Sequence, residues 1–68
     1  MKRQYLIRIK AYHAETKHKI QRIHPFYGTE QQAIKRAEQY RRKAYDKKLR
    51  QVSAEVFEVT DMRYIITV

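Results

Sequence analysis

The stretch from Thr29 to Leu49 constrains the fold more than any other part of the chain. Its apolar residues recur at helical spacing instead of alternating, which predicts an α-helix over this range. Thr29 is placed to cap the helix, and Gln32, three residues on, completes a capping box. The apolar stripe is narrow and rich in alanine, so we expect the helix to lie close against a sheet. Its members are Ala33, Ile34, Ala37, Tyr40, Ala44, Tyr45 and Leu49.

Two segments before the helix have the pattern of strands. Residues 5–11 alternate strictly, which is typical of a half-buried strand. The better core face carries Tyr5, Ile7, Ile9 and Ala11, and the opposite face carries Leu6, Arg8, Lys10 and Tyr12. Residues 13–17 interrupt the alternation without an Asn-Gly or Asp-Gly pair, so we expect a loop of about three to five residues there.

The second strand, over residues 19–26, has an irregular pattern. Ile20 and Ile23 are three residues apart, so either a bulge shifts the register or one of the two is exposed. Pro25 lacks a backbone N–H and therefore belongs on an edge strand or at a strand end. Gly28, where the chain turns into the helix, is free to adopt a positive φ.

Two further strands are expected after the helix. Residues 52–59 place Val52, Ala54 and Val56 on one face, and residues 60–62 form a plausible turn. In residues 63–68 the core face is expected to carry Tyr64, Ile66 and Val68.

The order strand, strand, helix, strand, strand predicts a two-layer α+β fold in one domain spanning residues 1–68. If the first strand lies between the second and third, every neighbouring pair is antiparallel and the sheet order is 2-1-3-4. One helix covers one face, so the other stays open. We expect that face to carry Arg8, Lys10 and Tyr12 with the apolar residues Leu6, Phe57, Val59 and Ile65. Such an apolar patch predicts a partner surface, most simply in a two-fold homodimer.

The charge distribution points to a polyanionic partner. The 68 residues carry a net charge of +9, and this charge is segregated. Residues 1–24 carry +6 and residues 29–50 carry +5, whereas residues 51–68 carry −2. We therefore expect nucleic acid or an acidic protein surface as the partner, contacted by the first hairpin and the helix.

Other classes of protein find less support in the sequence. No apolar run approaches the ~20 residues of a membrane span, and the absence of cysteine suits the cytoplasm. A single glycine cannot build a phosphate-cradling loop, and no serine or threonine has a nucleophile-elbow context. His13 and His18 flank the expected loop, but the ligands that would complete a zinc site are missing. We expect no enzymatic activity, no metal and no cofactor.

The expected binding residues follow from this charge pattern. Basic side chains on the helix suit contact with phosphates, and an outward tyrosine among cations suits stacking on a base. The set comprises Arg8, Lys10, Tyr12, Lys17, Lys19, Arg22, Lys35, Arg36, Arg42, Lys43 and Lys47.

The layout resembles that of small phage-encoded host-takeover proteins, in which a hairpin, a helix beginning Thr-x-x-x-Ala and a final strand or hairpin make the whole molecule. Thr29, Ala33 and Ala37 carry the resemblance. It implies a phage or mobile-element protein that inhibits a host polymerase, nuclease or CRISPR complex by occupying a site. The leading hypothesis from the residues is a small basic nucleic-acid-binding module. The alternative is a non-enzymatic inhibitor or adaptor of such a host complex.

Overall fold

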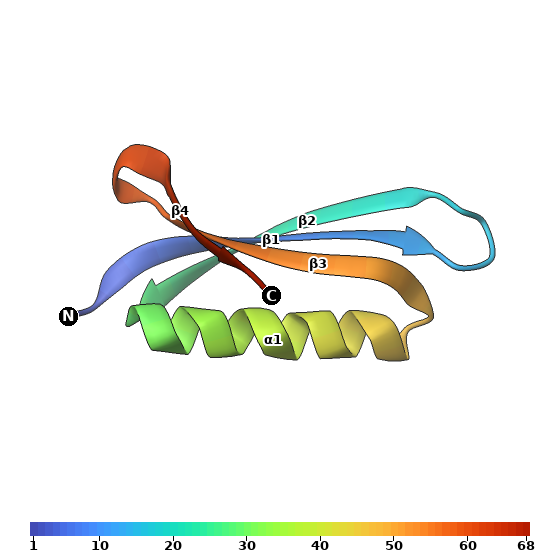
Figure 1. The fold of residues 1–68 in the computed structure, drawn as a ribbon, viewed down its shortest axis with the longest axis horizontal. Coiled ribbons are helices and arrows are strands. Elements are labelled where there is room, and N and C mark those ends of the chain that lie inside the picture. The colour runs from blue at the N-terminus through green and yellow to red at the C-terminus, as the bar shows by residue number, and fades with distance from the viewer.

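The computed structural model describes residues 1–68 and confirms the expected α+β architecture (Figure 1). The sheet is antiparallel with strand order β2-β1-β3-β4, as predicted. Helix α1 lies along one face of the sheet and leaves the other face uncovered. The elements are β1 (Arg3–His13), β2 (Lys19–Gly28), α1 (Glu30–Asp46), β3 (Leu49–Glu58), the short helix η1 (Thr60–Met62) and β4 (Arg63–Thr67).

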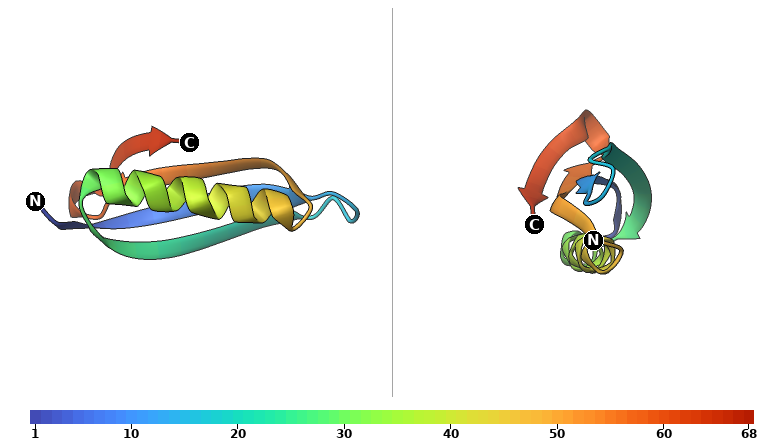
Figure 2. Two further views of the ribbon diagram at one scale, coloured as in Figure 1. Left: turned by 90° about the horizontal axis from the view of Figure 1, so that it is seen from below. Right: turned by 90° about the vertical axis from the view of Figure 1, so that its right-hand side faces the viewer.

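The molecule is elongated, with extents of 41 × 20 × 15 Å. The tip of the β1–β2 hairpin projects beyond the end of α1 in both side views (Figures 1 and 2). The sheet twists strongly, so β2 and β4 diverge when the molecule is viewed along its length (Figure 2). Because the hairpin extends past the end of α1, the helix does not cover the outer part of the hairpin.

The start of α1 has the predicted capping box. The backbone N–H of Gln32 donates to Thr29 Oγ1 at 3.2 Å, and the backbone N–H of Thr29 donates to Gln32 Oε1 at 3.0 Å. The helix ends at Asp46, three residues earlier than predicted. Lys48 adopts a φ of 64°, which breaks the helix and allows Leu49 to begin β3.

Gly28 was expected to use a positive φ, and this prediction is wrong. Its role is to leave space. A Cβ at this position would lie 2.6 Å from Gln32 Oε1 and 2.8 Å from Phe26 Cε2. The glycine therefore lets the capping residue Gln32 and the Phe26 ring approach the backbone closely.

The core is formed where α1 crosses the two central strands. The predicted core faces of β1 and β3 are confirmed, and the helix contributes three alanines with little exposed surface. These small side chains allow α1 to approach the sheet closely, with Ile7 and Val56 fully buried beneath it. The buried apolar set is Tyr5, Ile7, Ile9, Ala11, Ala33, Ala37, Ala44, Val52, Ala54 and Val56.

Strand β2 pairs with β1 without a register shift, which settles the ambiguity of its isoleucines. Ile20 lies opposite Ala11 on the helix side of the sheet, whereas Ile23 lies opposite Arg8 and is 55% exposed. The strand is at the sheet edge, as Pro25 requires.

Strand β4 corrects two predictions. Tyr64 was expected on the core face, but it lies opposite Phe57 on the outer face and is 54% exposed. Ile66 lies opposite the buried Val56 on the core face, as predicted, but remains 38% exposed. Ile65 was expected on the open face, but it packs against the core together with Val68. The cause is a register shift opposite β3, where Val56 pairs with Ile66 and Phe57 pairs with Tyr64. Ile65 is the extra residue, so simple alternation does not hold along β4.

Glu58 is a buried carboxylate that joins both ends of the chain. Its side chain is 3% exposed and accepts hydrogen bonds from Arg3 Nη1 and from Nε and Nη2 of Arg63, the latter at 3.1 and 2.8 Å. The hydrogen bonds from Arg3 and then Arg63 lower the pKa of Glu58. This cluster ties β1, β3 and β4 together at the end of the molecule opposite the hairpin tip.

Candidate nucleic-acid interface

The structure distributes the predicted binding residues over separate surfaces. Arg8, Lys10, Tyr12 and Lys19 lie on the outer sheet face, which is the face away from α1. Arg22, Lys43 and Lys47 line a groove between β2 and α1. The remaining residues, Lys17, Lys35, Arg36 and Arg42, lie elsewhere and are exposed.

Two cations of the outer sheet face are paired with an acid. Arg8 Nε donates to Glu55 Oε1 at 2.8 Å, and Lys10 Nζ lies 3.4 Å from the same oxygen. The hydrogen bond from Arg8 lowers the pKa of Glu55 and raises that of Arg8. The Arg8 guanidinium also lies over the Phe57 ring, 5.1 Å from its centroid. These contacts leave Arg8 and Lys10 less available to a polyanion than the sequence pattern indicates.

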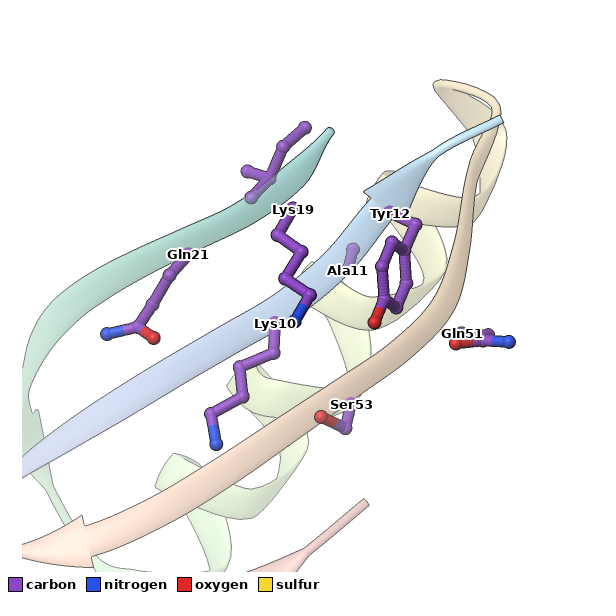
Figure 3. A pocket seen from close by; sticks show the side chains of 8 residues that line it. Lys10, Ala11, Tyr12, Lys19, Gln21, Gln51 and Ser53 are labelled. Carbon is purple, nitrogen blue, oxygen red and sulfur yellow. The ribbon is translucent and has the colours of Figure 1, made fainter. Parts of the chain in front are cut away.

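Tyr12 and Lys19 meet at the hairpin end of the outer face (Figure 3). Lys19 Nζ is 5.9 Å from the centroid of the Tyr12 ring. They line a depression of about 340 Å³ with Lys10, Ala11, Ile20, Gln21, Gln51 and Ser53. Gln51 has a φ of 54° at a bulge in β3, where its register with β1 shifts. The bulge therefore shapes one edge of this depression.

The basic residues of the helix are divided between its two flanks. Arg36 lies on the flank next to β2, with its guanidinium 5.4 Å from the centroid of the Phe26 ring. Arg42 lies on the other flank, in a hollow near Val68 that is also lined by Glu38, Arg41, Tyr45 and Asp46. The helix therefore does not present one continuous basic face, and Arg42 shares its hollow with the acidic residues Glu38 and Asp46.

A groove of about 610 Å³ lies between the hairpin and α1, and we call it the hairpin–helix groove. Strand β1 forms its floor, β2 forms one wall and the second half of α1 forms the other. The lining residues are Ile9, Ala11, His13, Ile20, Arg22, His24, Tyr40, Lys43, Ala44, Lys47 and Leu49.

The charge in the hairpin–helix groove is entirely basic. Arg22 projects from β2, Lys43 projects from the last turn of α1, and Lys47 is the C-cap residue of that helix. None of the three takes part in an ion pair. The basic partners in the ion pairs of the protein are Arg3, Arg8, Lys10, Lys48 and Arg63. No acidic residue lines the groove. The hairpin–helix groove therefore combines an apolar lining with three basic side chains that no acidic residue neutralises.

Besides the apolar lining, sequence reasoning missed three polar or aromatic residues of this groove, namely His13, His24 and Tyr40. The His24 and Tyr40 rings are stacked, with centroids 4.4 Å apart and planes 21° apart. The position of His24 could have been predicted from the sequence. It has the same strand parity as Ile20 and Arg22, so a continuous register places all three on the helix side of β2.

No group of three or more His, Asp or Glu side chains is placed to hold a metal ion. None of the helices has both the length and the apolar composition that crossing a membrane requires.

Comparison with protein-family models, with curated proteins and with solved structures finds no match for this chain.

Proposed function

We propose that the protein is a nucleic-acid-binding module that contacts phosphates through its first hairpin and its helix. The observation that carries this proposal is the hairpin–helix groove. Its three unpaired cations come from the two segments in which the sequence concentrates its positive charge, and no carboxylate competes for them. Phosphate contacts of this kind supply most of the affinity of sequence-independent nucleic-acid binding.

The test is a mobility-shift titration against random-sequence duplex and single strands at two salt concentrations. Each neutralised phosphate releases counterions, so log affinity should fall with log salt at a slope of about −0.9 per contact on duplex DNA and about −0.7 on single strands. If all three groove cations contact phosphates, the slope of log affinity against log salt should be about −2 or steeper. Absence of any shift at low salt, with the protein folded, would contradict the proposal.

A second candidate function is a non-enzymatic inhibitor or adaptor that docks on a host nucleic-acid-processing complex. The outer sheet face supports it, because large apolar side chains are exposed there beside cations. Ile23 is 55% exposed, Tyr27 65% and Tyr64 54%. Exposed aromatic and aliphatic side chains next to arginine are typical of protein contacts.

A pull-down from host lysate with and without nuclease separates the two functions. A stoichiometric protein partner that survives nuclease treatment supports the inhibitor. Loss of every partner after nuclease supports direct binding of nucleic acid.

A further inference from the structure

We infer that the hairpin–helix groove holds a single-stranded segment of nucleic acid, with a base on its apolar floor and the flanking phosphates on its cations. This inference rests on the proposed function and adds the site and the class of nucleic acid.

The floor of the groove is apolar, which phosphate contacts alone do not require. Ile9 and Ala11 on β1 and Ala44 on α1 are only 6%, 4% and 8% exposed, so the apolar surface open to a ligand comes mainly from the half-buried Ile20 and Leu49 near the hairpin tip. A phosphate gains nothing from such a surface, whereas the face of a nucleobase is flat and apolar. The floor therefore fits an unstacked base.

The cations are arranged on both walls above that floor. Arg22 lies on the β2 wall, and Lys43 and Lys47 lie one turn apart on the α1 wall. A strand that runs along the groove would pass between these walls with its phosphates near both. The groove is complementary in charge to a phosphate backbone, because its lining contains basic residues and no acidic residue.

A duplex does not fit the same arrangement. Its bases are stacked inside the double helix, so only phosphates would reach the groove and the exposed parts of Ile20 and Leu49 would gain no contact. The volume of about 610 Å³ lies within the roughly 300–1,000 Å³ of sites that enclose small ligands. It therefore suits a base with its flanking backbone better than the surface of a double helix.

The experiment measures fluorescence anisotropy of labelled oligo(dT), oligo(U) and a mixed-sequence duplex of equal length in the same moderate salt. We expect both single strands to bind at least about tenfold more tightly than the duplex. Comparison of oligo(dT) with oligo(U) shows whether DNA or RNA is preferred.

Charge variants locate the site. Lys43→Glu and Lys47→Glu should each weaken single-strand binding by about tenfold or more. Arg41→Glu makes the same change of charge on the opposite flank of α1 and should have less effect. Equal effects of all three would overturn the inference, since they would reflect net charge alone.

Floor variants test the apolar contact without changing charge. Leu49→Ser alters the groove alone, and Ile34→Ser makes a comparable change at a half-buried position of α1 that does not line it. Only Leu49→Ser should weaken oligo(dT) binding, by about fivefold or more, with the salt slope unchanged. Thermal unfolding of each variant confirms that it is folded at the assay temperature.

The unaltered protein supplies a measurement that does not depend on folded variants. A single strand containing 5-iodouracil, irradiated in the complex, should cross-link to His24 or Tyr40 in the groove, as read by mass spectrometry. Cross-linking to Tyr12 would place the strand on the outer sheet face and overturn the inference. Duplex binding as tight as single-strand binding would also overturn it while leaving the proposed function intact. Failure of all three nucleic acids to bind would overturn both.

Discussion

The imidazole of His24 on β2 stacks on the phenol ring of Tyr40 on α1, with ring centroids 4.4 Å apart. The two residues are sixteen positions apart in sequence and belong to different layers of the fold. Their contact fixes the distance between the edge strand and the helix where the hairpin–helix groove begins.

This ring pair should couple the stability of the two layers. In a double-mutant cycle with His24→Ala and Tyr40→Ala, we expect a coupling free energy of about 0.5–1.5 kcal/mol from urea unfolding. Tyr40→Phe preserves the ring and serves as the control, with little loss of stability. Additive effects of the two alanine substitutions would show that the rings do not stabilise each other.

Acid should destabilise the protein partly through Glu58. Arg3 and Arg63 lower its pKa in the folded state below its ordinary value of 4.5. Its contribution to stability is therefore fully present above pH 4.5 and is lost as the pH falls through the lowered folded-state pKa. We expect Glu58→Gln to flatten the fall in unfolding free energy between pH 5 and pH 3, measured by urea titration. Glu38→Gln, at an exposed helix position without an ion pair, is the matched control and should leave the slope nearly unchanged.

Gly28→Ala should destabilise the fold although the backbone at this position is ordinary. A Cβ would crowd Gln32 Oε1 and the Phe26 ring, at 2.6 and 2.8 Å. We expect a loss of about 1–3 kcal/mol in unfolding free energy, as is usual for overpacking. Combining Gly28→Ala with Phe26→Leu removes the more rigid obstacle and should restore part of the loss. Retention of full stability by Gly28→Ala alone would show that the capping side chain moves aside freely.

The exposed outer sheet face predicts self-association. Ile23 and Met62 are 55% and 56% exposed, and they line a small hollow of about 230 Å³ with Leu6, Arg8 and Phe57. Glu55 pairs with Arg8 and Lys10, which reduces the repulsion that these cations would cause across a two-fold axis. We expect sedimentation equilibrium at moderate salt to show a dimer.

Ile23→Glu should shift that equilibrium to the monomer, because a charge would enter the centre of the contact. Ile20→Glu is unsuitable as its control, since Ile20 is half-buried on the helix side. Glu38→Gln on the outer surface of α1 serves instead and should leave the dimer intact. A mass of one chain at every concentration would leave the outer face free for another protein.

The sequence by itself determined the elements of this protein and the inward faces of its two central strands. Thr29 and Gln32 cap α1 through contacts within four residues, and the alternation from Tyr5 to Ala11 depends only on strand geometry. The sheet order followed from connection rules that leave few alternatives for this order of elements. These features are local or topological, so a single sequence contains the information that specifies them.

Tertiary structure alone decided the register of β4 and the composition of the groove. The bulge that turns Ile65 towards the core depends on pairing with β3, and alternation within β4 cannot reveal it. The basic residues of the helix likewise share one sequence pattern, but they line different hollows. Lys43 and Lys47 line one groove with Arg22, whereas Arg42 lines another hollow with Glu38 and Asp46. Which cations converge depends on how the helix axis lies across the sheet. The packing of alanines in α1 against β1 and β3 sets that axis, and it leaves the apolar hollow beside β2.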